Sequence, residues 1–317
     1  MSDCSNNNPV CGILGTQYPI VLGAMRLITL AEMAAAVSNA GGFGLIAASG
    51  MEARELRKEL EKTKALTKKP VGINIPVYRP NTLELIEVAI EMGVKTITTS
   101  AGNPAKVMDL ARQGGVKVIH KVSSLKMAQK AQDAGVDAVI AMGFEAGGHV
   151  GREHVTTFCL VPQLVDNLDI PVLAAGGIVD ARGVAAAFAL GARGVEMGTR
   201  FVASNECPAP AFFQECLNKA DCEATLLLGK EAMPIRVLKN AVTAMVSGME
   251  SGEADQAMVQ SGDASYVMSG GDEHTAVMPC GQAAGLIDTV KSIDEIISEI
   301  TEGIRQIARD VEKSFFC

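Results

Sequence analysis

Residues 137–151 read DAVIAMGFEAGGHVG, an apolar run that leads into a glycine-rich turn containing a histidine. A short apolar run without polar alternation is typical of a strand that is covered on both faces. Loops that follow such strands often carry functional residues, because the rigid strand fixes their position. The stretch therefore predicts a parallel β-strand with a functional loop at its carboxyl end.

Seven further runs share this character, and amphipathic stretches separate them. The other expected strands are Pro19–Gly23, Gly42–Ala47, Val71–Ile75, Thr96–Ala101, Lys117–Val122, Pro171–Gly177 and Gly194–Phe201. The expected helices are Ala31–Ala40, Glu52–Leu66, Thr82–Met92, Pro104–Gln113, Ser124–Ala134, Phe158–Asn167 and Ala181–Leu190. Alternation of this kind predicts an α/β fold with parallel strands, and eight units favour a closed (β/α)8 TIM barrel over an open sheet.

Local signals support several helix boundaries. Ser124 and Asp180 stand where helices begin and can accept hydrogen bonds from the first free N–H groups. Gly135 and Gly191 stand where those helices should end, in positions that favour a left-handed residue.

The length of the chain suits one barrel with additions. A barrel takes about 250 residues, and the chain has 317. We assign residues 1–17 to an N-terminal extension, and residues 18–206 with 275–317 to the barrel and its closing helices. Residues 207–274 are rich in Met, Ala and polar residues, with helical periodicity and no clear strand, and predict a small helical insertion or cap.

Composition excludes several other classes of protein. The net charge of −8 argues against general binding to nucleic acid or to anionic membranes. No run of about 18 apolar residues predicts a membrane span, and the polar start has no signal-peptide core, so we expect a cytoplasmic protein. The eight cysteines form no C-x-x-C pair, which indicates free thiols, and no metal-ligand spacing is present.

Two glycine-containing segments predict a phosphate site. Ala175-Gly176-Gly177 ends the seventh expected strand, and Gly198-Thr199 lies within the eighth. Glycine lets main-chain N–H groups approach an anion closely, and the loops after strands seven and eight are the usual phosphate site of this barrel. Tight turns would explain the glycines alone, but both segments stand where a phosphate-bearing ligand would bind.

His149 is the main candidate for proton transfer. It follows the pair Gly147-Gly148 at the expected catalytic end of a strand, and imidazole gives or takes a proton near neutral pH. The alternative is a solvated loop histidine. The remaining histidines are weaker candidates: His120 in an expected strand, His154 and His274.

Two more strand ends carry candidate ligand contacts. The segment Gly23-Ala24-Met25 follows the first strand with small residues that suit close packing against a flat ring. Asn74 lies within the apolar third strand, where a buried amide needs hydrogen-bond partners. A ligand amide edge would serve Asn74, and a purely structural role is equally compatible with the sequence.

Together these stretches resemble the superfamily of nitronate monooxygenases and flavin-dependent enoyl-ACP reductases of the FabK type. The resemblance is carried mainly by Glu145-Ala146-Gly147-Gly148-His149-x-Gly151, with Ala175–Ile178 and Gly198–Phe201 similar to the FMN-phosphate loops. Residues 100–104, 236–240 and 281–286 lean toward the reductase branch. Arg26 and Tyr78-Arg79-Pro80 depart from the pattern of that branch at substrate-facing positions.

The resemblance implies a flavin reductase of fatty-acid synthesis. Hydride would pass from NADH or NADPH through FMN to the β-carbon of an enoyl thioester on acyl carrier protein or CoA. His149 would polarise the thioester carbonyl or assist proton transfer to the α-carbon. The residues expected to bind FMN are Gly23, Ala24, Met25, Asn74, Ala146, Gly147, Gly148, Ala175, Gly176, Gly177, Gly198, Thr199 and Gln282.

Partners follow from the same resemblance. Lys230, Arg236 and Lys239 would contact an anionic carrier or pyridine nucleotide, although a solvated helix face explains them as well. The resemblance also allows a bound monovalent cation, whose ligands the sequence does not place, and barrels of this type often form homodimers.

Two other functions stay open. A nitronate monooxygenase would use His149 as a base on an alkyl nitronate, would react with oxygen and would not need NAD(P)H. The third reading is a barrel without flavin that binds a phosphorylated metabolite.

Overall fold

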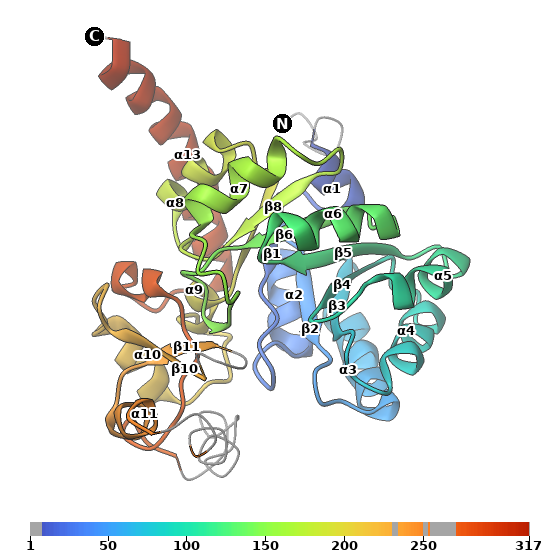
Figure 1. The fold of residues 1–317 in the computed structure, drawn as a ribbon, viewed down its shortest axis with the longest axis horizontal. Coiled ribbons are helices and arrows are strands. Elements are labelled where there is room, and N and C mark those ends of the chain that lie inside the picture. Colours follow the sequence, from blue (N-terminus) through green and yellow to red (C-terminus); the bar gives the residue numbers. More distant parts are fainter. Residues whose placement is uncertain (1–7, 230–233, 250–252, 254–270, 317) are drawn as a thin grey trace.

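The protein is a closed eight-stranded barrel surrounded by helices (Figure 1). The computed structural model describes residues 8–229, 234–249, 253 and 271–316. The parallel strands run in the order β1-β9-β8-β6-β5-β4-β3-β2, and a bridge between Val21 and Phe43 joins the two edges. The strands are β1 (Ile20–Leu22), β2 (Gly44–Ala47), β3 (Val71–Pro76), β4 (Thr96–Ser100), β5 (Lys117–Val122), β6 (Ala138–Met142), β8 (Val172–Ala175) and β9 (Gly194–Met197). The predicted TIM barrel is confirmed.

All seven predicted crossover helices form on the outside of the barrel. They are α2 (Ala31–Asn39), α3 (Ala53–Leu66), α4 (Thr82–Glu91), α5 (Ala105–Gln113), α6 (Leu125–Ala134), α7 (Thr157–Val165) and α8 (Ala181–Ala189). Their boundaries have local causes that the sequence signals anticipated. The Ser124 hydroxyl accepts a hydrogen bond from the Met127 N–H at the start of α6, and Gly135 ends that helix with φ of 85°. At α8, the Asp180 carboxylate accepts from the N–H groups of Arg182 and Gly183.

The eighth predicted strand ends earlier than expected. The run Gly194–Phe201 is a strand only to Met197, and the chain then turns into α9 (Thr199–Val202). Gly198 makes this turn with helical dihedrals, so Thr199 stands at the start of a helix rather than inside a strand.

The N-terminal segment closes one end of the barrel. Helix α1 (Pro9–Leu14) begins where the Asn8 side chain accepts from the N–H groups of Val10 and Cys11. Val10 and Leu14 pack in a buried cluster with strand residues from the barrel interior, including Leu45. The predicted N-terminal extension therefore contributes to the core of the barrel.

The C-terminal helix α13 (Ile293–Phe316) packs against α8 and α2 on the outside of the barrel. Ile293, Ile296, Ile297 and Ile300 are buried in this contact. The last turns of α13 extend away from the rest of the molecule (Figure 1). No helix in the described part of the chain is long and apolar enough to cross a membrane.

The insertion after β9 contains strands as well as helices, and here the sequence prediction was wrong. Between α10 (Ala211–Asn218) and α11 (Ala241–Ser247) the chain forms β10 (Thr225–Leu228) and β11 (Ile235–Leu238). These strands make an antiparallel sheet with β7 (Gly148–His149), which belongs to the loop after β6. Four-residue runs carry too little periodicity to be recognised, and their partner strand lies far away in the sequence.

Candidate active site

One large cavity opens at the carboxyl ends of the barrel strands. Its volume is about 500 Å³, which is in the range of small-molecule sites. Almost all the residues predicted to bind a cofactor line it together with His149: Gly23, Ala24, Met25, Asn74, Ala146, Gly147, Gly148, Ala175, Gly176, Gly177, Gly198 and Thr199. Gln282 is not among the lining residues, whereas its neighbours Gly281 and Ala283 are. The Gln282 N–H instead donates to the Glu145 carbonyl at 2.9 Å.

The turn after β8 requires its two glycines. Gly176 and Gly177 have φ of 94° and 75°, in the left-handed region that glycine adopts without strain. A Cβ atom on Gly176 would also lie 2.9 Å from the Gly143 carbonyl oxygen. The turn therefore brings bare main chain to the cavity wall, beside the start of α9.

The loop after β6 is anchored by Glu145. Its carboxylate accepts from the N–H of Thr157 at 2.8 Å and from the Thr157 hydroxyl at 3.1 Å. The same hydroxyl is 2.8 Å from the Gly176 carbonyl oxygen. Glu145 therefore ties the loop to the first turn of α7 and to the glycine turn, which gives this residue of the motif a structural role.

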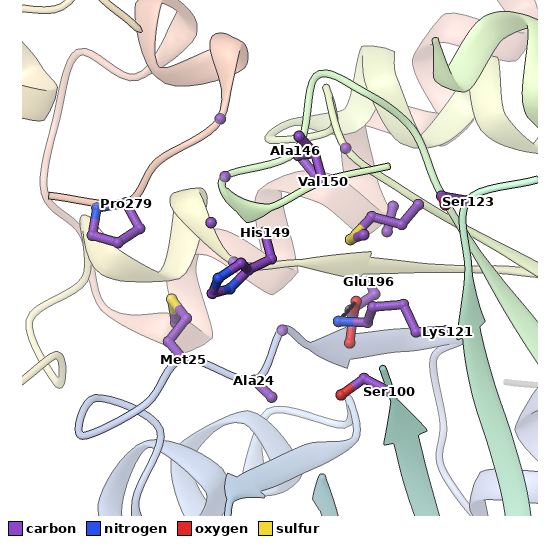
Figure 2. A pocket seen from close by; sticks show the side chains of 18 of the residues that line it. Ala24, Met25, Ser100, Lys121, Ser123, Ala146, His149, Val150, Glu196 and Pro279 are labelled. Atoms are coloured by element: carbon purple, nitrogen blue, oxygen red, sulfur yellow. Dashed lines mark ion pairs between the residues drawn. The ribbon is translucent and has the colours of Figure 1, made fainter. Parts of the chain in front are cut away.

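His149 is held by the insertion. The short strand β7 pairs with β11 in the register His149–Ile235 and Gly148–Arg236, and the next N–H, of Val150, donates to the Pro234 carbonyl at 2.9 Å. The imidazole is exposed on the cavity side and points into the same cavity as Met25, Lys121 and Glu196 (Figure 2). A proton donor or acceptor thus faces any ligand that the cavity holds.

Arg236 is buried rather than solvated, so the interpretation of this residue as part of a solvated helix face was wrong. Its guanidinium donates to the Phe144 carbonyl and to the Thr225 hydroxyl, and lies 4.7 Å from the centroid of the Phe144 ring. Burial lowers the pKa of Arg236 below its usual value. Lys239 is exposed, and Lys230 lies outside the described residues.

An ion pair that the sequence analysis missed lies at the cavity floor. The Lys121 Nζ atom is 2.7 Å from Glu196 Oε2, and the two side chains are 16% and 4% exposed. The other carboxylate oxygen, Oε1, is buried and has no hydrogen-bond partner. Both residues lie in predicted strands whose ends reach the cavity. A charged residue within an otherwise apolar strand was the feature of the sequence that could have indicated this pair.

Asn74 is buried at the same floor. Its amide nitrogen donates to the Thr98 hydroxyl at 2.8 Å, and the residue also lines the cavity. The neighbouring strand thus fixes the orientation of the amide, so that the side chain can present a defined hydrogen-bonding edge to a ligand.

The remaining histidines lie elsewhere. His120 is buried, with its Nδ1 atom 2.8 Å from the Thr99 hydroxyl, and burial lowers its pKa to about 4. His154 stacks on Phe144 with ring centroids 4.2 Å apart. His274 is exposed beside Glu273. Within the described ranges, no group of three or more His, Cys, Asp or Glu residues could hold a metal ion.

Known proteins share this architecture. The FabK structure from Thermotoga maritima superposes with a TM-score of 0.93 at 38% identity, covering 98% of this chain and 99% of that one. A (3aS,4S,5R,7aS)-5-hydroxy-7a-methyl-1-oxo-octahydro-1H-indene-4-carboxyl-CoA dehydrogenase of Rhodococcus jostii is 37% identical over 75% of this chain, a match that spans 66% of that relative. A probable nitronate monooxygenase of Staphylococcus saprophyticus is 34% identical over 67% of this chain and 72% of its own length.

The family itself is shown by a match along almost the whole chain. The model of the family described as nitronate monooxygenase matches residues 7–303, from the helix that closes the barrel to the middle of α13. The chain therefore belongs to the nitronate monooxygenase family, the group of oxidoreductases in which its FabK-like barrel is found.

Proposed function

We propose that the protein is an FMN-dependent reductase of enoyl thioesters that takes its hydride from NADH or NADPH. The observation that carries the proposal is the position of His149, which points into a cavity that the glycine turns after β8 and β9 also line. The similarity to FabK at 38% identity over 98% of the chain supports the reductase branch.

The cavity fits FMN, on which this family typically depends. Gly176, Gly177, Gly198 and Thr199 line it where barrels of this type bind phosphate, and we expect them to hold the phosphate of FMN. A Cβ on Gly147 would collide with the Cys280 main chain at 2.5 Å, so only glycine lets these two walls approach. Gly148 has φ of 71° and open space around it, so the main chain is bare where a flat ring could lie.

The residues of the chain then have separate tasks. Bound FMN would supply the hydride acceptor and donor, as cofactors do in such enzymes. His149 would polarise the thioester carbonyl or deliver the proton to the α-carbon of the substrate. Asn74 and the Lys121–Glu196 pair would provide hydrogen bonds and charge at the cavity floor.

A nitronate monooxygenase is the second candidate. The family model itself and the 34% identical relative in Staphylococcus saprophyticus favour it. In that reaction molecular oxygen would replace the thioester as electron acceptor, and His149 would act as a base where the substrate enters as the neutral nitroalkane. The same glycine turns would hold FMN in both reactions. The two functions therefore differ in the substrate that the protein accepts, and an assay with each substrate distinguishes them.

A pair of assays on the FMN-loaded protein tests the proposal. We expect oxidation of NADH or NADPH that depends on crotonyl-CoA under anaerobic conditions. Oxygen uptake with propionate-3-nitronate, without pyridine nucleotide, would instead support the monooxygenase. A protein that cannot be reconstituted with FMN, judged from its visible absorbance spectrum, would overturn both assignments.

A further inference from the structure

The active-site cavity is more basic than the protein as a whole. The chain carries a net charge of −8. Yet the basic side chains that line the cavity outnumber the acidic ones; they are Arg26, Arg79, Lys121 and Arg152, against Glu145 and Glu196. An acidic protein with a basic cavity attracts anions to that one place, since low-dielectric walls focus the local field.

The two carboxylates are already engaged within the cavity wall. Glu196 pairs with Lys121, and Glu145 accepts hydrogen bonds from Thr157. Both acidic side chains of the lining are thus engaged within the wall, and the remaining charged residues of the lining are basic.

Arg26 and Arg79 lie on other loops of the rim than the two glycine turns after β8 and β9. Arg26 lies in the loop after β1 and extends over the loop after β2, because its Nε atom would be 3.1 Å from a Cβ on Gly50. Arg79 lies in the loop after β3. In the strand order of the closed barrel, β3 stands opposite β8, the strand that carries the Gly176-Gly177 turn. The cavity thus has a second place for an anion, at Arg79, across from the turn of Gly176 and Gly177.

Arg79 has unused hydrogen-bonding capacity and an aromatic neighbour. Its Nε atom is buried and has no hydrogen-bond partner. The adjacent Tyr78 also lines the cavity, with 59% of its surface exposed. A planar guanidinium binds phosphate with directed hydrogen bonds, and an exposed aromatic ring gives a nucleobase a surface for stacking.

We propose that Arg26, Tyr78 and Arg79 form a binding site for the phosphorylated adenosine end of a substrate. Two reactants of the proposed reaction carry this group, the CoA thioester and the pyridine nucleotide, so the inference rests on the proposed function. Arg26 and Arg79 bind the phosphates, and the Tyr78 ring contacts the adenine.

Calorimetric titration of the FMN-loaded protein tests the site without turnover. The probes are 3′,5′-ADP, the nucleotide end of CoA, and 2′,5′-ADP, that of NADPH. We expect the wild type to bind at least one of them. Arg26→Gln and Arg79→Gln should each raise its Kd by about 10-fold, the effect of losing a charged hydrogen bond. Tyr78→Ala should raise it by about 10-fold through the lost stacking surface. Arg305→Gln, a change of an exposed arginine on α13, is the control and should not alter the Kd.

Steady-state kinetics then identifies the reactant. A raised KM for crotonyl-CoA, with an unchanged KM for crotonyl-N-acetylcysteamine and an unchanged kcat, assigns the site to the thioester. A raised KM for NADPH alone assigns it to the pyridine nucleotide. The site is overturned if the wild type binds neither probe, or if all three variants bind as the wild type does. The protein could bind a probe through the arginines and yet show no reductase activity. That result would support the binding site and contradict the proposed reaction.

Discussion

The guanidinium of Arg236 donates two hydrogen bonds to the main-chain carbonyl of Phe144. The distance to the carbonyl oxygen is 2.9 Å from Nη2 and 3.2 Å from Nε. Phe144 begins the loop that ends at His149, so a residue of the insertion holds the start of a barrel loop. Together with the pairing of β7 and β11, this contact fixes the loop at both ends. Arg236 is thus a positioning residue for the imidazole.

Arg236→Met should lower kcat by about 10- to 100-fold, because a small displacement of a reacting group is costly. The free energy of unfolding should fall by about 2 kcal/mol for the lost charged hydrogen bonds. Steady-state kinetics and urea unfolding measure the two effects, and Lys239→Met, an exposed change in the same segment, is the control. If Arg236→Met lowered stability while kcat stayed normal, the positioning role would be lost. Arg236→Lys should restore part of kcat.

His149→Ala should lower turnover by about 10²- to 10⁴-fold, the usual contribution of a general acid or base. FMN should still bind, since the glycine turns expected to hold its phosphate belong to other loops of the cavity. The two readouts are kcat and the visible spectrum of the purified variant. His154→Ala is the matched control, because His154 lies near the same loop but stacks on Phe144. Equal turnover in wild type and His149→Ala would remove the imidazole from the mechanism.

Gly148→Ala tests the bare main chain beside His149. Its φ of 71° and that of Gly93, 76°, are alike, and neither residue has atoms within 4 Å of an added Cβ. Both substitutions should therefore cost about 1–2 kcal/mol of stability through left-handed strain. Only Gly148→Ala should weaken FMN binding, because Gly93 lies beyond α4, away from the residues that line the cavity. Fluorescence titration with FMN measures the two affinities. Equal affinities of the two variants would contradict a role for the Gly148 main chain in FMN binding.

The Lys121–Glu196 pair should behave as a coupled unit. Removing one partner leaves the other charge buried, and such a change typically costs about 3–5 kcal/mol. We expect Lys121→Met and Glu196→Gln each to destabilise the protein at the lower end of that range, since Lys121 keeps 16% exposure. The double variant should be less destabilised than the sum of the two. Additive losses in a urea-unfolding cycle would show that the pair is not coupled.

The sequence predicted the barrel well because its signals are local. Apolar runs, cap residues such as Ser124 and Asp180, and the glycines after β8 each act within a few positions of the chain. The same signals placed almost every predicted cofactor residue in one cavity. The insertion was harder to predict. β7 becomes a strand only because it pairs with β11, and no local sequence pattern indicates that partner. Arg236 was misread for the same reason, since its burial depends on Phe144, far away in the chain.

His120 should make stability depend on pH. Its pKa is about 4 in the folded protein because burial disfavours the charged ring, against the usual 6.5. The unfolded chain therefore binds the proton more readily, and stability should fall as pH drops from about 6.5 toward 4, by about 3 kcal/mol in total. Above that window His120 contributes no slope.

Urea unfolding at a series of pH values measures this effect. His120→Gln should remove most of the slope between pH 4 and 6.5, whereas His274→Gln, which changes an exposed histidine, should retain it. A slope of the same size in His120→Gln would assign the dependence to other groups.

The position of helix α1 affects the order in which parts of the protein fold during synthesis. Asn8 donates a hydrogen bond to the carbonyl of Arg193, and Val10 packs against residues from strands throughout the barrel. This segment therefore cannot reach its final place until Arg193 has been synthesised. Its docking closes a loop of more than half the chain, so the end of the barrel opposite the cavity should stay unprotected during translation at least until Arg193 has been made.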